Sequence, residues 1–181
     1  MKKAISKALL RWAGWKLGPV CEDVPKCVVC VAPHTSNWDF IVGKLFYNAL
    51  GRNANFLIKK EWFFFPFNLL FKWLGGVPVD RHKRTSVTDQ MVEEFARRDR
   101  FQLAVTPEGT RKRVKEWKKG FYYIAEKAHV PILVAYFDYK KKEAGIKTIF
   151  YPTGDADKDI RQIREYYRGV TARHPENFVQ I

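Results

Sequence analysis

Residues 27–50 read CVVCVAPHTSNWDFIVGKLFYNAL, and the hydrophobic pattern of this stretch changes in its middle. The first six residues form a short, largely β-branched run before Pro33, which predicts a buried strand. After the polar residues HTSN, the segment WDFIVGKLFYNAL predicts a helix that ends near Gly51, because glycine often terminates helices. A strand joined to a helix by a short polar loop is the repeating unit of α/β folds.

The rest of the chain repeats this alternation. Further strands are predicted at NFLI (55–58), GVPVD (76–80), FQLAVTP (101–107), PILVAYFDY (131–139) and KTIFYP (147–152). Helices are predicted at about 3–17, 85–98, 118–128 and 157–172. We therefore expect an α/β domain with a layered, mixed and largely parallel sheet flanked by helices. In such folds, ligands gather at polar residues just beyond the strand ends.

Two ionisable residues lie in the polar loop and the helix start of the opening stretch. His34 follows the predicted strand, and Ser36 and Asp39 have the spacing of a capping box at the helix start. In a loop that turns into a helix, His34 can fold back toward the Asp39 carboxylate. An aspartate that accepts a hydrogen bond from one ring nitrogen leaves the other nitrogen basic, which is the arrangement of a general base. On spacing alone, a simple helix cap beside a surface histidine explains the pair equally well.

A second polar segment, PEGTR at residues 107–111, follows another predicted strand. Pro107 and Gly109 predict a turn, and Arg111 begins a run of basic residues. Such a turn can present backbone N–H groups and a guanidinium to a phosphate. A solvated basic loop is the alternative interpretation.

Taken together, these segments resemble the glycerolipid acyltransferases of the lysophosphatidic acid acyltransferase (PlsC-like) family. The resemblance rests on four blocks in the family's order: PHTSNWD contains its H-x4-D, GGVPVDR ends in its arginine, PEGTR contains its E-G-T-R, and HVPILVAYF resembles its V-P-I block. The blocks cover roughly residues 26–140. We therefore divide the chain into an N-terminal amphipathic membrane-associating helix at 1–20 and an acyltransferase domain at 21–181.

The resemblance implies an O-acyltransferase that moves a fatty acyl group from an acyl-CoA or acyl-carrier-protein thioester to a lysophospholipid hydroxyl. The usual acceptor in the family is 1-acylglycerol 3-phosphate, and another lysolipid such as a lyso-aminolipid is the alternative. The implied roles are general base for His34, its orientation for Asp39, and acceptor binding for Glu108, Gly109, Thr110 and Arg111, supported by Arg81 and by Lys59 or Lys60. No metal or organic cofactor is implied, because the thioester is already activated.

The charge of the chain implies an anionic partner. Lys and Arg number 33 against 19 Asp and Glu, which leaves a net charge of +14. The basic segment at 3–17 and the aromatic run from Trp62 to Trp73 are typical of segments at a bilayer surface, although the aromatic run can equally be core or line an acyl-chain site. Because that run is too short to span a bilayer, we expect a peripheral protein on the cytoplasmic face of an anionic membrane. A nucleic-acid-binding domain is the rival class, but it leaves the H-x4-D and E-G-T-R blocks unexplained.

The three cysteines argue against a disulfide framework, because their number is odd and no secretory segment precedes them. A zinc site that uses Cys21, Cys27, Cys30 and His34 is conceivable from their spacing. However, Cys27 and Cys30 lie three residues apart in a predicted strand, so their side chains should point to opposite faces of the sheet. We therefore favour a packing role for the cysteines.

Overall fold

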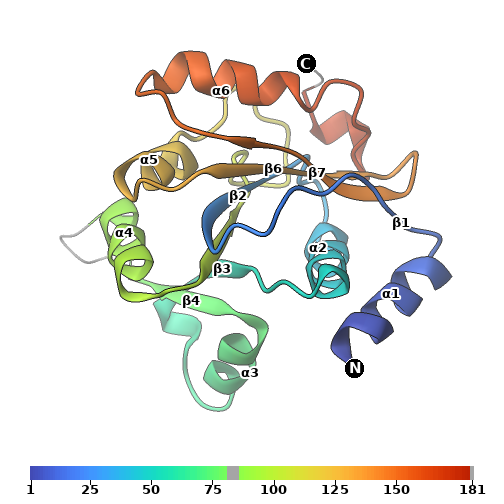
Figure 1. Cartoon of the computed structure of the whole chain (residues 1–181), viewed down its shortest axis with the longest axis horizontal. Coiled ribbons are helices and arrows are strands. Elements are labelled where there is room, and N and C mark those ends of the chain that lie inside the picture. The colour runs from blue at the N-terminus through green and yellow to red at the C-terminus, as the bar shows by residue number, and fades with distance from the viewer. Residues whose placement is uncertain (81–85, 180–181) are drawn as a thin grey trace.

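The computed structural model describes residues 1–80 and 86–179. Seven strands form one sheet in the order β1-β7-β6-β2-β5-β3-β4 (Figure 1). Their bounds are β1 Lys16–Leu17, β2 Lys26–Ala32, β3 Asn55–Lys59, β4 Gly76–Val79, β5 Phe101–Val105, β6 Ile132–Asp138 and β7 Glu143–Phe150. All neighbouring strands pair in parallel except β6 and β7, which are antiparallel. The predicted α/β fold with a mixed, largely parallel sheet is confirmed.

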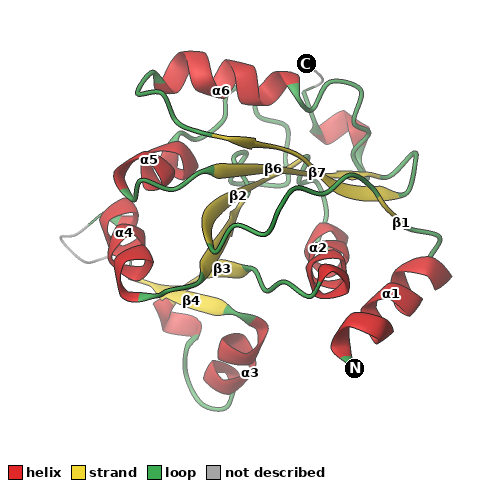
Figure 2. Cartoon of the chain, viewed as in Figure 1, coloured by secondary structure: helices red, strands yellow, loops and turns green. Residues whose placement is uncertain are grey.

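Helices cover both faces of the sheet (Figure 2). They are α1 Lys2–Trp12, α2 Trp38–Leu50, α3 Phe67–Leu74, α4 Val87–Arg97, α5 Gly120–Lys127 and α6 Ala156–Glu165, with short 3₁₀ turns at Lys60–Trp62 and Pro175–Asn177. One core packs α4, α5 and α6 against the sheet, and a second core packs α1 and α2 against the opposite face. The strand that carries the site, β2, therefore lies between two apolar layers.

The cysteines of β2 follow the prediction made from their spacing. Cys27 belongs to the core under α1 and α2, whereas Cys30 belongs to the core under α4, α5 and α6. Both side chains are fully buried, and they point to opposite faces of the sheet. The two thiols therefore serve packing on separate faces.

Two predicted helices are too long. The N-terminal helix ends at Trp12 rather than near residue 17, because Gly14 turns the chain at a φ of +78° and Lys16 and Leu17 join the sheet beside β7. The last helix ends at Glu165, and its apolar pattern continues through Tyr167 and Val170 in the turns that follow, both of which are buried. Side-chain periodicity thus persisted where the helical hydrogen bonding had already ended.

Helix α3 was not predicted as a helix. The helix ends at Gly75, which has a φ of +91°, and none of the eight helical residues is buried. Figure 1 places it beyond β4, the edge strand of the sheet. The aromatic run therefore forms a projection from the domain rather than part of its core. Within the described residues, no helix combines the length and apolarity that crossing a bilayer requires.

Candidate functional site

The site forms where three parallel strands end at one edge of the sheet. β2 lies between β5 and β6, and its last residues pair with the ends of both neighbours, Cys30 with Val105 and Ala32 with Tyr136. The segments that leave these strands, starting at residues 33, 106 and 139, therefore meet at this edge. Loops at the carboxyl ends of parallel strands are the usual place for a site in such folds.

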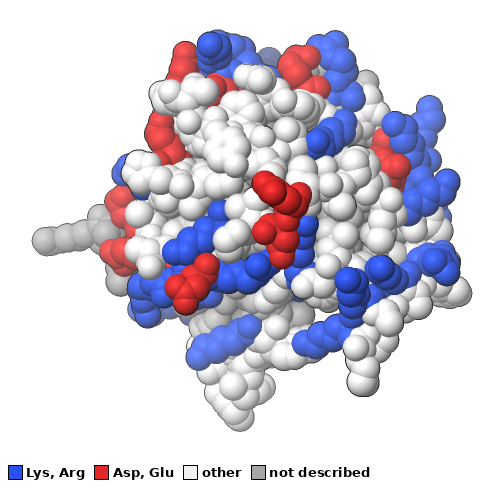
Figure 3. Space-filling model, viewed as in Figure 1, with Lys and Arg blue, Asp and Glu red and all other residues white. Residues whose placement is uncertain are grey.

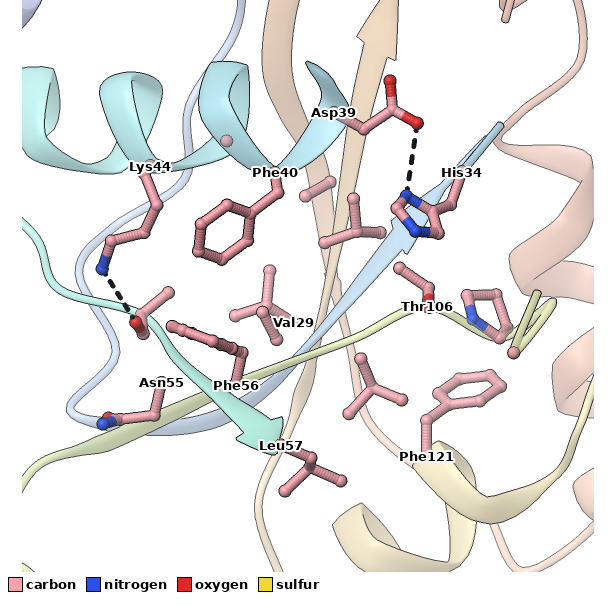
Figure 4. Close-up of a pocket in the computed structure, with 18 of the residues that line it drawn as sticks. Val29, His34, Asp39, Phe40, Lys44, Asn55, Phe56, Leu57, Thr106 and Phe121 are labelled. Carbon is pink, nitrogen blue, oxygen red and sulfur yellow. Dashed lines mark hydrogen bonds and ion pairs between the residues drawn. The ribbon is translucent and has the colours of Figure 1, made fainter. Parts of the chain in front are cut away.

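His34 and Asp39 are in contact. The Nδ1 atom of His34 lies 3.2 Å from Oδ2 of Asp39, and the Asp39 side chain is only 2% exposed (Figure 4). The same Oδ2 accepts the backbone N–H groups of Thr35 (2.8 Å) and Ser36 (2.9 Å). The bond from Ser36 is one half of the predicted capping box, and Ser36 Oγ accepts from Trp38 N–H instead of from Asp39.

These contacts keep Asp39 ionised. Burial by itself raises the pKa of Asp39, but hydrogen bonds from His34, Tyr139 and Ser36 outweigh burial and hold that pKa below its ordinary value. A carboxylate on Nδ1 selects the tautomer that leaves Nε2 of His34 as the basic atom. The pair can therefore act as a general base with an orienting carboxylate.

Glu108 supports His34 through the backbone. Its two carboxylate oxygens lie 2.9 and 3.2 Å from the His34 backbone nitrogen and accept its N–H, and the side chain is buried. Burial raises the pKa of Glu108 to about 7. The backbone N–H and the imidazole of His34 lower this pKa, but they only partly offset the effect of burial. The sequence led us to expect Glu108 at the acceptor, whereas its hydrogen bonds connect the E-G-T-R turn to the H-x4-D loop.

The raised pKa of Glu108 predicts that Glu108→Gln stabilises the folded protein at high pH but not at low pH. Between pH 4.5 and about 7 the native carboxyl retains its proton while the unfolded one ionises, so this group lowers the stability as pH rises through that window. The difference between the two pKa values corresponds to about 3 kcal/mol at most. Glutamine can still accept the His34 N–H, so at pH 8 the variant should have the larger free energy of unfolding.

Urea unfolding at pH 4.5 and pH 8 checks this prediction. The two proteins should be nearly equal at pH 4.5 and differ at pH 8. The matched control is Glu116→Gln, an exposed glutamate of the same loop, which should follow the wild type at both pH values. A stability difference between Glu108→Gln and wild type that is the same at both pH values contradicts the assignment.

The E-G-T-R turn opens onto a cavity beside His34. A cavity of about 420 Å³ is lined by His34, Thr106, Gly109, Thr110, Arg111 and Lys112. Gly109 has a φ of +64°, and a Cβ there would lie 2.8 Å from the Lys118 side chain, so the turn requires glycine. The predicted residues Gly109, Thr110 and Arg111 are thus assembled around His34.

A larger and mostly apolar cavity of about 850 Å³ extends from the same histidine. His34, Arg111 and Lys118 line it, and its walls come from β2, β3, α2 and α5, including Val29, Phe40, Phe46, Phe56, Leu57 and Ile124. Figure 4 shows Phe40 and Phe56 pointing into this space from two different elements. The cavity can therefore hold a long apolar group whose reactive end lies at His34.

Two of the remaining predicted cations, Lys59 and Lys60, are not part of these cavities. Lys59 and Lys60 are both described and exposed, and neither lines either cavity; the Lys60 ammonium lies 3.2 Å from an Asp80 carboxylate oxygen. Arg81 lies outside the described residues. The arrangement of the site therefore gives no reason to prefer Lys59 over Lys60 as the supporting cation.

Several residues that line or support the site were not predicted from the sequence, among them Lys44 and Tyr139. Lys44, on α2, lines the apolar cavity and donates to the carbonyl of Leu74 at 2.7 Å, and burial lowers its pKa. A lysine within the otherwise apolar helix WDFIVGKLFYNAL was the available signal. Another such residue is Tyr139, whose hydroxyl donates to Oδ1 of Asp39 at 2.5 Å. Its position as the last residue of a predicted strand could have suggested it.

Comparison with known proteins identifies relatives of this arrangement. The family model described as Acyltransferase matches residues 21–137. The fold is similar to the crystal structure of the 1-acyl-sn-glycerophosphate (LPA) acyltransferase PlsC from Thermotoga maritima, with a TM-score of 0.63 and 20% identity over 91% of this chain and 74% of that chain. At this identity the likeness concerns the fold. No curated protein sequence matches the chain.

Proposed function

The chain belongs to the acyltransferase family, and from this premise we propose that it transfers a fatty acyl group from a thioester to the hydroxyl of a lysophospholipid. The observation that carries the proposal is the position of His34. Its imidazole contacts a buried carboxylate on one side and lines both an apolar cavity and a cationic one on the other. A substrate pair with an acyl chain and an anionic head group matches these surroundings.

The proposed mechanism is direct transfer. Nε2 of His34 takes the proton of the acceptor hydroxyl while the oxygen attacks the thioester carbonyl carbon. The tetrahedral intermediate collapses, the C–S bond breaks, and the thiolate of CoA or of the acyl carrier protein leaves and takes up the proton that His34 received, which returns the imidazole to its neutral form. Asp39 stabilises the imidazolium formed in the first step. The thioester supplies the activation, so the step needs no cofactor.

For the acceptor, we propose 1-acylglycerol 3-phosphate, which the reaction converts to phosphatidic acid. Arg111 lines both cavities and carries a guanidinium that can form two hydrogen bonds to a phosphate. Thr110 and Lys112 add a hydroxyl and an ammonium to the smaller cavity. A lysolipid with another head group, such as a lyso-aminolipid, is the alternative acceptor.

Acylation of a lysolipid panel tests this function. Purified protein is incubated with labelled acyl-CoA or acyl-carrier protein and with lysolipids that differ in head group, and the products are identified by mass. Phosphatidic acid from 1-acylglycerol 3-phosphate is the expected product. Failure to acylate any lysolipid with either donor refutes the proposed function, and a preference for another head group refutes the acceptor.

The surface around α3 supports a peripheral location on an anionic membrane, which we place on the cytoplasmic side. Large apolar side chains are exposed on residues 62–73, namely Trp62, Phe64, Phe65, Phe67, Leu69, Leu70 and Trp73. We call this set the apolar surface. Lys59, Lys60 and Lys72 flank it, and Lys2 of α1 lies over the Trp73 ring at 4.9 Å. In Figure 3 the region of α3 projects as uncharged atoms with Lys and Arg beside it. Exposed aromatics bordered by cations suit the interface of an anionic bilayer.

Replacing Phe65 and Trp73 with serine should therefore weaken binding to vesicles that contain anionic lipid. At about 1.5 kcal/mol for each large apolar side chain that leaves water, the two side chains contribute about 3 kcal/mol, so the double change should lower the partition coefficient about 100-fold. Co-sedimentation measures it. The control is Tyr151→Ser, an exposed aromatic after β7 and outside the apolar surface, which should bind as wild type does. Equal loss in both variants would disprove the location.

A further inference from the structure

The carboxylate of Asp39 has two oxygens with different partners. Oδ2 faces His34 and accepts the two backbone N–H groups of its own loop. On the other side, the Tyr139 hydroxyl donates to Oδ1 at 2.5 Å. Rotation of the carboxylate about its Cβ–Cγ bond would exchange these partners, so the tyrosine opposes that rotation from the side away from the histidine.

Tyr139 is itself firmly positioned. It follows β6 directly, and its backbone N–H donates to Thr171 O at 2.9 Å. Its ring packs edge-on against Trp15 at a centroid distance of 5.0 Å, and the Arg173 guanidinium lies 5.9 Å from the ring centroid. Burial, and then the contact with Asp39, raise the pKa of Tyr139 above its ordinary value, so the phenol keeps its proton and acts as the donor.

The segment that holds Tyr139 also contacts the histidine loop. The backbone N–H of His174 donates to Oγ1 of Thr35 at 3.2 Å, and the backbone N–H of Thr35 in turn binds Asp39. Tyr139, Thr171 and His174 all lie beyond residue 137, where the match to the acyltransferase family model ends. The support for Oδ1 thus comes from a part of the chain that the family match does not include.

We propose that Tyr139 is a positioning residue of the reaction, which acts through Asp39 by holding Oδ1 so that Oδ2 faces Nδ1 of His34. The assignment rests on the proposed function for its effect on turnover. Its effect on the imidazole is independent of any substrate. In its neutral form, the His34 imidazole carries its proton on Nδ1, and without the tyrosine hydroxyl the Nε2–H tautomer gains population.

The structure provides a closely matched control. Tyr136 lies on the preceding strand, is buried, and its hydroxyl donates to a Glu143 carboxylate oxygen, also at 2.5 Å. Tyr136→Phe and Tyr139→Phe therefore each remove one oxygen and one bond to a carboxylate, but only the second carboxylate belongs to the His34 pair. The phenylalanine retains the ring that packs against Trp15 in the second variant. Urea unfolding of both variants checks that each is folded.

The test combines turnover with the tautomer of His34. In Tyr139→Phe, kcat should fall about tenfold with the KM of both substrates unchanged, and in an Asp39→Ala background the same change should have less than about a twofold effect. The ¹⁵N shifts of labelled histidine, with the His34 signal identified by its loss in His34→Ala, should show a larger Nε2–H fraction in Tyr139→Phe than in wild type or Tyr136→Phe.

The two readouts separate this proposal from the proposed function. If wild type acylates no lysolipid, the proposed function fails while the tautomer measurement still decides the role of Tyr139. A wild-type tautomer in Tyr139→Phe overturns the assignment whatever the activity. In an active enzyme, full kcat in that variant, or an equal loss in the Asp39→Ala background, overturns it as well.

Discussion

Replacing His34 with alanine should lower kcat for acyl transfer by about 10²- to 10⁴-fold, the usual contribution of a general base. The reason is that Nε2 of His34 is the atom proposed to take the proton of the acceptor hydroxyl. The His34 side chain is 18% exposed and lines both cavities, so urea unfolding first checks that the truncated protein is folded. Asp39→Asn should also lower kcat, because the tautomer and the imidazolium lose their carboxylate partner.

Steady-state kinetics of the folded variants measure this loss. The matched control is His129→Asn, which removes an exposed imidazole at a φ of +52°, a conformation that asparagine tolerates. That variant should keep wild-type kcat. A folded His34→Ala protein with full activity would rule out the mechanism.

The same mechanism predicts that acyl donor alone leaves no label on the polypeptide. The thiols are poor nucleophiles, because burial raises the pKa of Cys21, and raises that of Cys27 to about 12. Cys30 is completely buried, and burial raises its pKa as well. Stable label on the chain, or parallel-line kinetics, would point to an acyl-enzyme instead.

Arg111→Ala should raise the KM for 1-acylglycerol 3-phosphate by about 10- to 100-fold, the range expected when a hydrogen bond to a charged group is lost. Arg111 lines both cavities beside His34, whereas its neighbour Arg113 lines neither and is exposed. Arg113→Ala therefore serves as the control for general loss of positive charge on the loop. It should change KM by little.

An acceptor without phosphate sharpens this measurement. With a monoacylglycerol as the probe, Arg111→Ala and wild type should have similar KM values, because the guanidinium has no phosphate to bind. Wild-type KM for 1-acylglycerol 3-phosphate in Arg111→Ala would show that the phosphate binds elsewhere. An equal rise in KM with both acceptors would assign Arg111 to another part of the substrate.

Much of the fold was accessible from hydrophobic periodicity. The strand that precedes His34 forms as predicted. The helix that follows His34 also ends as predicted, at Gly51, which has a φ of +80°. The N-terminal helix was overextended because Lys16 and Leu17 form a strand of only two residues, too short to produce a period. Helix α3 was missed because it has only eight residues, none of which is buried, so its apolar residues do not mark a face packed on the core.

In the candidate site, too, contacts within one local segment were more accessible from the sequence than contacts between distant segments. His34 and Asp39 lie in one local segment, so their contact could be proposed from their spacing and the helix start, with a simple helix cap as the equal alternative. The sequence could not predict that Glu108 binds the backbone of His34, since these residues are 74 positions apart. Lys59 and Lys60 looked equivalent in sequence, but Lys60 pairs with Asp80 and both lysines lie away from the cavities.

By itself, the sequence determined the alternation of strands and helices, the blocks that resemble the family and the local pair of His34 and Asp39, because each depends on residues close together in the chain. Only the tertiary structure decided which loops meet at His34, and that Tyr139, 100 positions from Asp39, donates to its second oxygen. The physical reason is strand order: β2 pairs with β5 on one side and β6 on the other, and no local period encodes that choice.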